Sequence, residues 1–429
     1  MKDLLRAIIP KFLFKALQPT YHGLMARIAS IYFGNPGKKL FIIGVTGTAG
    51  KSTTVIMCAQ ILNFAGKKCG YITTAGSSNG NINKVNSHGL SMPGGWMMQQ
   101  QLADMVASGC THAIVECTSE GLAQNRHLGI NFQMALFTNL SPAHIDSHGS
   151  FDNYRAAKGK LFAALNGKGT IGANLDDPNK NYFLNFPSSK KFGVSMRPDL
   201  PKPENMKVLF AENVNVSDKI SFSVSGKSFE LHLYGTFNVT NALLAIGAAE
   251  NLGVSLEQAA SALGQIGTVP GRMEIIKASN GATIVVDYAP EPAAMEASLR
   301  SILLIPHKKI IHVFGSTGGH RDVAKRFEFG AISAKFADMI IITNDDVYDS
   351  DPEEIATNIK EGIAKVQNNH PEIVTLLDRK KAIAHAITLA EPEDIILITG
   401  KGSEQFLILP GNERISWDDR KVVKELLAQ

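Results

Sequence analysis

Short apolar runs alternate with helix-length amphipathic stretches along most of the chain after residue 39. The run "KLFIIGVTG" (39–47) ends in glycine, as a buried parallel strand does, and "STTVIMCAQILNFAG" (52–66) follows with helical spacing. "HAIVECTS" (112–119) and "MALFTNLS" (134–141) are two more apolar runs that end in small polar residues. This pattern predicts a mostly parallel sheet with helices on both faces, whose ligands bind at the carboxyl ends of the strands.

The pattern changes twice toward the C-terminus. From about 168 to 236 the apolar runs are shorter and alternate with polar residues, as in "ISFSVSGKSFELHLYG" (220–235), which predicts antiparallel hairpins. After "VPGRMEII" (269–276), the buried type of run returns in "TIVVDYA", "KIIHVFGS", "DMIIITND" and "DIILITGKG". The sequence therefore predicts an α/β protein in three parts: an N-terminal segment 1–39, a central domain 40–273 with a small antiparallel region, and a C-terminal Rossmann-like domain 274–429.

Composition excludes several classes of protein. With 44% hydrophobic and 19% charged residues over 429 positions, the chain is typical of a globular α/β protein. No apolar run approaches the ~20 residues that span a membrane, and Pro10, Lys11 and Lys15 interrupt the apolar N-terminus, so no secretory signal is expected. The four cysteines form no C-x-x-C pair, which argues against a zinc site or a disulfide framework and favours the reducing cytoplasm.

Positive charge is concentrated at the N-terminus. Residues 1–39 contain seven lysine and arginine residues against Asp3 alone, whereas the net charge of the whole chain is only +4, so the remainder is slightly acidic. A nucleic-acid-binding surface on the main body is therefore not indicated. The segment "LLRAIIPKFLFKALQPTYHGLMARIASIYFG" (4–34) mixes large apolar residues with cations. Two interpretations stay open: one or two helices that pack against the body, or a surface that contacts anionic lipid head groups.

The segment "GVTGTAGKSTT" (44–54) lies between the first predicted strand and the first predicted helix after residue 39. Consecutive backbone N–H groups and the positive end of the helix dipole converge there, which suits a polyphosphate. Lys51 would reach the β- and γ-phosphates, and the Ser52 hydroxyl would be available to Mg²⁺. The longer pattern G-x-x-x-x-G-K-[ST] requires a glycine where this chain has Val45. A plain glycine-rich turn is the alternative.

This loop resembles the shorter G-T-x-G-K-[ST]-[ST] loop of the Mur ligases, ATP-dependent enzymes that form amide bonds in peptidoglycan synthesis. The likeness continues in order along residues 40–429, in blocks that include "VECTSEGLAQNRHLG", "FTNLSPAHIDSHGSFDNYRAAKGKLF", "GTFNVTNALLAIGAAENLG", "VVDYAPEP", "FGSTGGHRDVAKR" and "ITGKGSEQF". These blocks resemble the UDP-N-acetylmuramoyl-tripeptide synthetases, the branch that adds the third peptide residue. The resemblance implies a central phosphate-loop ATPase domain and a C-terminal domain that binds the incoming amino acid.

Candidate catalytic and metal-binding residues follow from the strand ends and from the resemblance. Glu116 lies at the end of the predicted strand "HAIVE" and His144 just beyond "ALFTNL", and a carboxylate and an imidazole at one sheet edge suit a divalent metal ion. Periodicity alone makes Lys158 a solvated helix lysine. In the Mur ligases, however, the lysine of this block is carbamylated by CO₂ and helps to place the metal ions. The resemblance therefore implies a catalytic set of Lys51, Glu116, His144 and Lys158, and a metal set of Ser52, Glu116, His144 and carbamylated Lys158.

The resemblance also implies three sets of substrate contacts. The muramoyl-peptide acceptor would be held by Thr118, Gln124 and Arg126, whose guanidinium fork suits a carboxylate or a phosphate. The incoming amino acid would be held by Arg321, Asp345, Gly400 and Glu404. ATP would be held by Gly47, Thr48, Gly50, Lys51, Ser52, Thr53, Asn238, Asn241, Arg272 and Asp287. Helix capping is the alternative role of the two asparagines.

The chain departs from the family pattern at several positions. Where enzymes that add diaminopimelate have D-N-P-R, this sequence has "DDVY" (345–348), so lysine or ornithine fits as well as diaminopimelate. Pro290 and Ala143 replace a histidine and an aspartate in "DYAP" and "AHID". Family members normally carry a separate N-terminal domain for the uridine nucleotide, whereas the phosphate loop begins here after residue 43. We therefore expect either a weakly held uridine end or an acceptor on another carrier, such as a lipid.

Three functions stay open from the sequence. The expected one is an ATP-dependent ligase that adds a diamino acid to a muramoyl-peptide carboxylate through an acyl phosphate. The alternatives are a related ligase for a folylpolyglutamate-, cyanophycin- or lipid-II-type acceptor, and an inactive nucleotide-binding regulator of wall synthesis. The expected cofactors are ATP and Mg²⁺, and the expected partners are the muramoyl-peptide and the amino acid, without nucleic acid. We expect a monomeric, cytoplasmic protein with peripheral membrane contact through residues 1–39.

Overall fold

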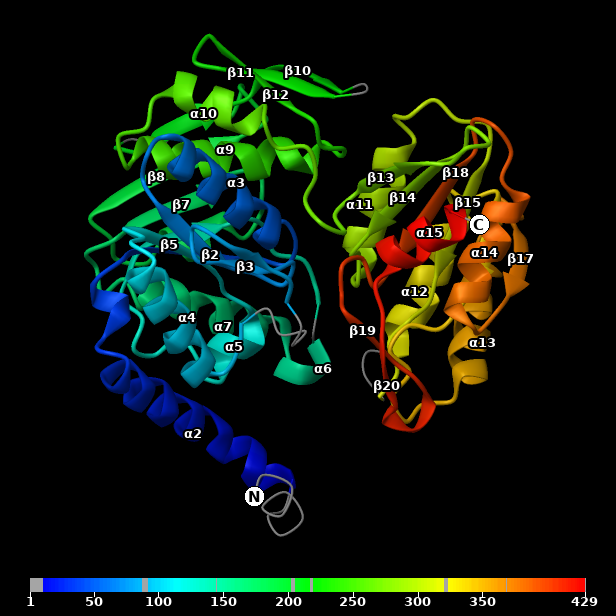
Figure 1. Cartoon of the computed structure of the whole chain (residues 1–429), viewed down its shortest axis with the longest axis horizontal. Coiled ribbons are helices and arrows are strands. Elements are labelled where there is room, and N and C mark those ends of the chain that lie inside the picture. The colour runs from blue at the N-terminus through cyan, green and yellow to red at the C-terminus, as the bar shows by residue number, and fades with distance from the viewer. Residues whose placement is uncertain are drawn as a thin grey trace. The chain divides into compact units, whose positions relative to one another are not determined.

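The fold is described by a computed structural model that covers residues 11–86, 92–143, 145–201, 205–216, 219–319, 323–367 and 369–428 (Figure 1). The chain forms two compact units. The N-terminal unit comprises Met1–Asn213, Phe222–Phe229 and Val239–Leu263, and the C-terminal unit comprises Val214–Ser221, Glu230–Asn238 and Gly264–Gln429. The predicted α/β class, with a large and mostly parallel sheet and small antiparallel sheets, is confirmed.

The N-terminal unit is built on a nine-stranded sheet in the order β4-β3-β2-β5-β1-β6-β7-β8-β9. Within this sheet, each neighbouring pair from β2 through β5, β1, β6, β7 and β8 to β9 is parallel. Strands β3 and β4 form an antiparallel edge beside β2. The central strands are buried almost throughout, because helices cover both faces. The strands are β1 (Phe41–Thr46), β2 (Cys69–Ile72), β3 (Ser77–Ser78), β4 (Asn83–Lys84), β5 (His112–Glu116), β6 (Phe132–Phe137), β7 (Thr170–Asn174), β8 (Lys190–Ser195) and β9 (Lys207–Phe210).

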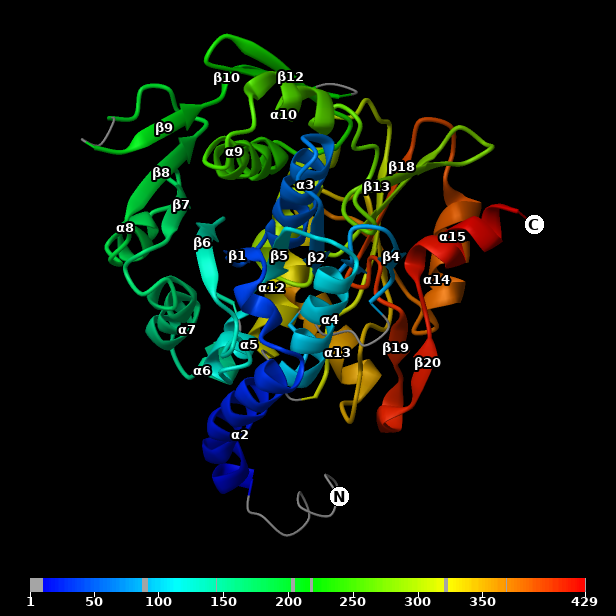
Figure 2. The same cartoon turned by 60° about the vertical axis from the view of Figure 1, so that its left-hand side comes forward.

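Helices lie on both faces of this sheet, with α3, α9 and α10 on one side and α4, α5 and α7 on the other (Figures 1 and 2). The long helix α2 precedes the sheet and packs along α4. The helices are α2 (Lys11–Tyr32), the 3₁₀ turn η1 (Pro36–Lys38), α3 (Lys51–Phe64), α4 (Gly95–Ala107), α5 (Ser119–Ala123), α6 (Ile145–His148), α7 (Phe151–Ala163), α8 (Lys180–Leu184), α9 (Phe237–Glu250) and α10 (Leu256–Leu263).

The prediction of hairpins from 168 to 236 is wrong for its first half. Strands β7, β8 and β9 continue the parallel sheet instead. Gly172 and Gly193 interrupt the apolar runs in the sequence, but each lies against a bulky neighbour, Phe192 and Leu175 respectively, that fills the missing side-chain space. A separate three-stranded sheet is formed by β10 (Glu212–Val216), β11 (Ile220–Val224) and β12 (Lys227–Leu231).

The C-terminal unit contains a six-stranded sheet in the order β13-β14-β18-β15-β16-β17. All neighbouring pairs are parallel except β13 with β14. A two-stranded ribbon, β19 (Phe406–Ile408) with β20 (Arg414–Ser416), flanks the turn η2 (Pro410–Asn412). The six strands are β13 (Glu274–Lys277), β14 (Thr283–Asp287), β15 (Ile310–Phe314), β16 (Met339–Ile342), β17 (Glu372–Thr375) and β18 (Ile395–Thr399).

Alternate residues of these strands point into two different hydrophobic cores. Ile310, Ile340 and Ile395 pack against α11 (Pro292–Ile302), α12 (Val323–Ala334) and α13 (Pro352–Ile363). Ile311 and Ile396 pack on the opposite face against α14 (Arg379–Leu389) and α15 (Asp419–Leu427). Because both faces are covered, the carboxyl edge of the sheet is left to carry polar side chains.

Candidate active site

The loop between β1 and α3 is short because β1 extends to Thr46. Val45, where the longer sequence pattern has glycine, is a fully buried strand residue paired with Glu116. The loop thus spans residues 47–50 and ends at Gly50, the N-cap of α3, which has a φ of 80° and provides no side-chain cap. A glycine there leaves the first N–H groups of the helix accessible to an anion.

Two lysines lie against this loop from different elements. Lys51 Nζ donates hydrogen bonds to the carbonyl oxygens of Gly47 (3.1 Å) and Thr48 (2.8 Å). Lys158 Nζ, from α7, donates to the same Gly47 oxygen at 2.7 Å and lies 4.4 Å from the centre of the Tyr154 ring. Lys158 is 2% exposed, so it is a buried amine at the loop and not the solvated lysine that its periodicity indicated.

Hydroxyl and carboxylate oxygens meet on the other side of the loop. Ser52 Oγ donates to Glu116 Oε2 at 2.7 Å, and Thr74 holds the same carboxylate through its backbone N–H (2.9 Å) and its hydroxyl (3.0 Å). Glu116 ends β5 and is 2% exposed. A buried carboxylate beside a hydroxyl is a donor set that Mg²⁺ accepts. His144, the third predicted metal ligand, lies outside the described residues.

The remaining predicted contacts of the N-terminal unit serve local structure as well. Thr118 caps α5 by accepting a hydrogen bond from the N–H of Gly121. Gln124 Oε1 accepts two hydrogen bonds from the guanidinium of Arg126, at 3.0 and 2.7 Å. Burial lowers the pKa of Arg126, against the opposing effect of Glu120.

Two predicted ATP contacts lie close to the loop. Asn241, in α9, lies against Gly50, and its side-chain oxygen accepts a hydrogen bond from the Thr54 hydroxyl at 3.3 Å. Thr53 is buried in the first turn of α3.

Three of the predicted ATP contacts, Asp287, Arg272 and Asn238, lie in the C-terminal unit. Asp287, at the end of β14, accepts hydrogen bonds from the N–H of Met273 at 3.1 Å and from the Ser298 hydroxyl. Burial raises the pKa of Asp287, although Ser298 and the nearby Arg272 act in the opposite direction. The guanidinium of Arg272 lies 4.4 Å from the centre of the Tyr288 ring. Asn238 donates to the carbonyl oxygen of Tyr234 at 2.7 Å.

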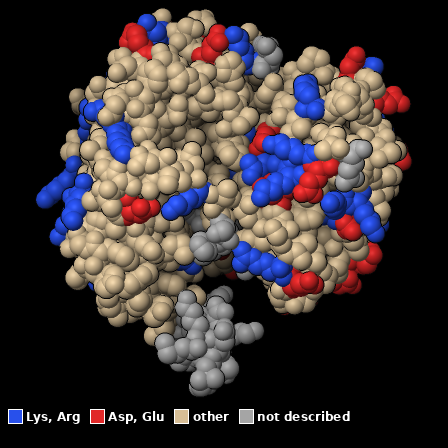
Figure 3. Space-filling model, in the orientation of Figure 1, with Lys and Arg blue, Asp and Glu red and all other residues tan. Residues whose placement is uncertain are grey.

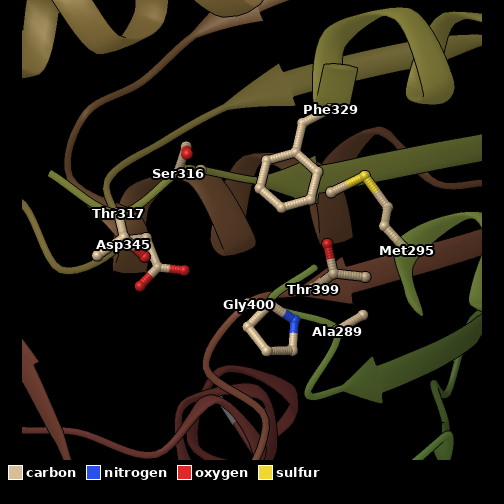
Figure 4. A pocket seen from close by; sticks show the side chains of 10 residues that line it. Ala289, Met295, Ser316, Thr317, Phe329, Asp345, Thr399 and Gly400 are labelled. Atoms are coloured by element: carbon tan, nitrogen blue, oxygen red, sulfur yellow. The ribbon is translucent and has the colours of Figure 1, made fainter. Parts of the chain in front are cut away.

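A small pocket opens at the carboxyl edge of the C-terminal sheet (Figure 4). The carboxylate of Asp345 lies on one side of it, and the apolar side chains of Phe329 and Met295 lie on the other (Figure 4). The pocket is therefore acidic at one end and apolar at the other. Its lining residues are Ala289, Pro290, Met295, Gly315, Ser316, Thr317, Phe329, Asp345, Thr399 and Gly400.

A buried group of charges adjoins this pocket. Lys401 Nζ forms ion pairs with Asp346 at 2.8 Å and with Glu404 at 2.6 Å, and the carboxylate of Asp345 lies close to Gly400. Burial raises the pKa of Glu404 from 4.5 to about 7, although Lys401 acts in the opposite direction. Burial and the neighbouring Asp345 likewise raise the pKa of Asp346. Acid groups with raised pKa values beside a pocket are a common feature of binding sites.

Sequence reasoning missed some members of these groups. Lys401 and Asp346 stand within the blocks "GKGSE" and "TNDD", and their block positions were the only signal available. Thr74 lies in no such block, and only the fold brings it to Glu116. Arg321, the predicted ligand for a carboxylate of the amino acid, lies outside the described residues.

A phosphate-binding loop on a parallel sheet, followed by a second α/β unit, defines a nucleotide-binding enzyme of the phosphate-loop type. Residues 45–249 match the Mur ligase middle domain, and residues 271–402 match the Mur ligase, glutamate ligase domain. The chain belongs to the Mur ligase family, whose members are ATP-dependent ligases.

Similar proteins cover most of the chain. It is 33% identical over 410 residues to the UDP-N-acetylmuramoyl-L-alanyl-D-glutamate–2,6-diaminopimelate ligase of Geobacillus kaustophilus, covering 93% of this chain and 81% of the relative. It is 34% identical over 433 residues to the UDP-N-acetylmuramyl-tripeptide synthetase of a Roseiflexus species, covering 96% of this chain and 83% of the relative.

Solved structures show the same fold. A 2,6-diaminopimelate ligase structure superposes with a TM-score of 0.60 at 27% identity, covering 91% of this chain and 78% of that one. The folylpolyglutamate synthase of Mycobacterium tuberculosis superposes with a TM-score of 0.69 at 18% identity, covering 88% and 92% respectively. The second likeness concerns the fold alone.

Proposed function

We propose that this protein joins a diamino acid to a muramoyl-peptide carboxylate through an acyl phosphate, at the expense of ATP, in the synthesis of peptidoglycan precursors. The observation that carries the proposal is the convergence of Lys51, Lys158 and the Ser52–Glu116 pair on one phosphate-type loop. Transfer of a phosphoryl group to a carboxylate concentrates negative charge. The Lys51 ammonium group and a metal ion held by Ser52 and Glu116 would be suited to stabilise that charge.

ATP and Mg²⁺ fit the residues present. The N-terminus of α3 would hold the phosphates, with Lys51 neutralising the β- and γ-phosphoryl groups. Ser52 and Glu116 would provide oxygen ligands for Mg²⁺, with His144 as a proposed third ligand. Bound Mg²⁺ would neutralise charge on the transferring phosphoryl group. Asn238, Asn241, Arg272 and Asp287 stay proposed contacts of the nucleotide.

We also propose that Lys158 is carbamylated in the active enzyme. The buried amine donates to the carbonyl oxygen of Gly47, in the proposed phosphate loop, and lies over the ring of Tyr154. A carbamate there would replace a cation by an anion and add oxygen ligands for a metal ion. Mass spectrometry under CO₂ and electron density at the side chain are direct tests, and an unmodified amine in both would remove this part of the proposal.

The incoming substrate is proposed to be an amino acid with a side-chain amine. The pocket of Figure 4 has an apolar wall for methylene groups and the carboxylate of Asp345 for an amine. Lys401 is already paired with Asp346 and Glu404, and Arg379 is paired with Asp419. Since the described cations of this group are engaged by carboxylates, a second carboxylate on the substrate gains little there. Lysine or ornithine is thus favoured over diaminopimelate.

The acceptor and the setting are proposals of the same kind. Thr118, Gln124 and Arg126 would contact the muramoyl-peptide, within the proposed central domain 40–273, and Arg321, Asp345, Gly400 and Glu404 would contact the amino acid in the proposed domain 274–429. A cytoplasmic location is proposed because ATP is the phosphoryl donor. A monomeric state and peripheral membrane contact through residues 1–39 stay proposals.

Phosphate release from ATP tests the function directly. The purified chain is supplied with muramoyl-dipeptide on a uridine nucleotide or on a lipid, together with lysine, ornithine or meso-diaminopimelate. Release that requires one acceptor and one diamino acid supports the proposal, and mass spectrometry of the product identifies both. Phosphate release with folate or other acceptors would indicate that the protein is a related ligase. ATP binding without phosphate release under any condition would indicate that it is a nucleotide-binding regulator.

A further inference from the structure

In helix α2 the small residues are buried and the large apolar residues are exposed to solvent, which is the reverse of the usual arrangement. The face that meets the rest of the unit is made of small residues: Gly23, Ala26, Ala29 and Ser30 are buried. A Cβ atom added at Gly95 of α4 would overlap Ala26, so the two helices approach as closely as their backbones allow. The small residues thus hold α2 on α4, and the large apolar residues of the helix are left for its other face.

The outward face of α2 is apolar. Its first five members, from Leu17 to Ile31, lie at alternating spacings of four and three residues, which is one face of an α-helix, and Tyr32 lies four residues after Ile28. They are between 45% and 71% exposed, whereas large apolar side chains of a surface helix normally face the core. These residues are Leu17, Tyr21, Leu24, Ile28, Ile31 and Tyr32.

An aromatic group extends this face onto α4. Trp96 is 39% exposed, and its ring centre lies 5.1 Å from that of Tyr32 and 5.4 Å from that of Phe33. Tyrosine and tryptophan favour the boundary between water and lipid, where the ring is buried and the polar atom stays hydrated. In the view of Figure 3, the surface over α2 is mostly uncharged.

Exposed cations lie in α2 and directly after it. Arg27, Lys38 and Lys39 are exposed, and residues 11–39 contain no aspartate or glutamate. A second copy of the chain would bring these cations against an equal set. An anionic surface would attract all of them, by about 1 kcal/mol for each lysine or arginine near the membrane. Charge therefore favours an anionic lipid surface over self-association.

We propose that the outward face of α2, continued by Trp96, docks the protein on anionic lipid bilayers, with the helix lying in the plane of the interface. No helix in the described part of the chain is long and apolar enough to cross a bilayer. The apolar side chains enter the head-group boundary while Arg27, Lys38 and Lys39 pair with lipid phosphates. This docking does not depend on the ligase reaction, because none of these residues belongs to the candidate active site.

Vesicle co-sedimentation of the full chain tests the proposal. Vesicles of phosphatidylcholine alone are compared with vesicles that also contain phosphatidylglycerol. We expect binding to the anionic vesicles that weakens as salt is added. Leu24→Gln/Ile28→Gln should weaken it about tenfold or more, since both half-exposed side chains lose their apolar burial. The matched control is Leu303→Gln/Leu304→Gln, with side chains 43% and 45% exposed in the C-terminal unit, and it should bind as the parent does.

A charge variant separates the two contributions. Arg27→Gln/Lys38→Gln/Lys39→Gln should lose most of the preference for anionic vesicles, by up to about a hundredfold at low salt. Thermal unfolding and ATP binding are measured for every variant and should match the parent, because the substituted side chains are exposed.

Three outcomes would overturn the proposal. One is a parent chain that binds neither kind of vesicle at low salt. Another is a Leu24→Gln/Ile28→Gln variant that binds as tightly as the parent. The third is a concentration-dependent dimer in analytical ultracentrifugation that this variant abolishes, without vesicle binding by the parent, which would assign the face to a second copy of the chain.

Discussion

Replacing Gly50 by alanine tests how tightly the phosphate loop is built. Gly50 has a φ of 80°, and a Cβ atom there would overlap Asn241 Oδ1. Gly253 has nearly the same φ, 78°, but a Cβ atom there would meet no atom within 4 Å. Gly253→Ala therefore isolates the backbone cost from the cost of the contact.

The structure gives the expected magnitudes. A non-glycine residue in the left-handed region costs roughly 1–2 kcal/mol, and both variants should lose this much. Gly50→Ala should lose a further ~1–3 kcal/mol, because Asn241 is 2% exposed, is held by Thr54, and has little room to move. If the strain is relieved by a shift of the loop that breaks one charge-assisted hydrogen bond to phosphate, ATP affinity falls about tenfold to a hundredfold.

Urea denaturation and calorimetric titration with ATP measure the two effects. The loss of unfolding free energy from Asn241→Ala to Gly50→Ala/Asn241→Ala should contain only the backbone cost. The contact cost should be absent, because the side chain that a Cβ atom at residue 50 would overlap has been removed. Equal loss of stability in Gly50→Ala and Gly253→Ala, with unchanged ATP affinity in both, would refute the argument that Asn241 and the loop are packed against each other.

Three further predictions concern single charged groups. Lys51→Ala should lower the rate of phosphate release by ~10²–10³, measured in a coupled assay, and a loss within a few-fold would contradict its assigned role. Because burial raises the pKa of Glu404 to about 7, the folded state binds a proton that the unfolded chain releases above about 4.5. The free energy of unfolding of the parent should therefore fall as the pH rises between these values, with a slope that denaturant titrations should find to be shallower in Glu404→Gln. Arg379→Met should cost ~3–5 kcal/mol in urea unfolding, since it leaves Asp419 buried and unpaired, whereas the exposed Arg300→Gln should cost at most about 0.5 kcal/mol. Similar losses in these two variants would contradict this assignment.

Local patterns correctly predict the strand, turn and helix on which the proposed phosphate loop and the strand-end carboxylate lie. Lys51, Ser52 and Glu116 follow directly from a strand, a turn and a helix, because the geometry of that unit is set within a few residues. Lys158 is different. Its position at Gly47 depends on where α7 packs, more than a hundred residues along the chain, and its helical spacing alone indicates solvent. The resemblance to a family supplied this residue, and the spacing did not.

Strands β7 to β9 and helix α2 also depend on packing between distant segments, which local sequence patterns do not predict. The short apolar runs of β7 and β8 favour hairpins in the sequence, whereas in the fold Phe192 and Leu175, from other strands or loops, fill the space beside Gly172 and Gly193. The apolar N-terminal helix was expected from its composition. That Ala26 faces inward and Leu24 outward could not be read from hydrophobicity, since the usual rule gives the opposite orientation.

The close approach of α2 to α4 has a consequence for which substitutions the helix tolerates. On its inner face, side-chain volume is limiting: at Ala26 even a leucine has no room, although it is more apolar. On its outer face, volume is free and only polarity matters. A saturation scan of residues 17–32 read out by folding would reveal the first constraint alone. The second would emerge only from selection for growth in cells, where lipid is present, so the two scans should disagree at Leu24 and agree at Ala26.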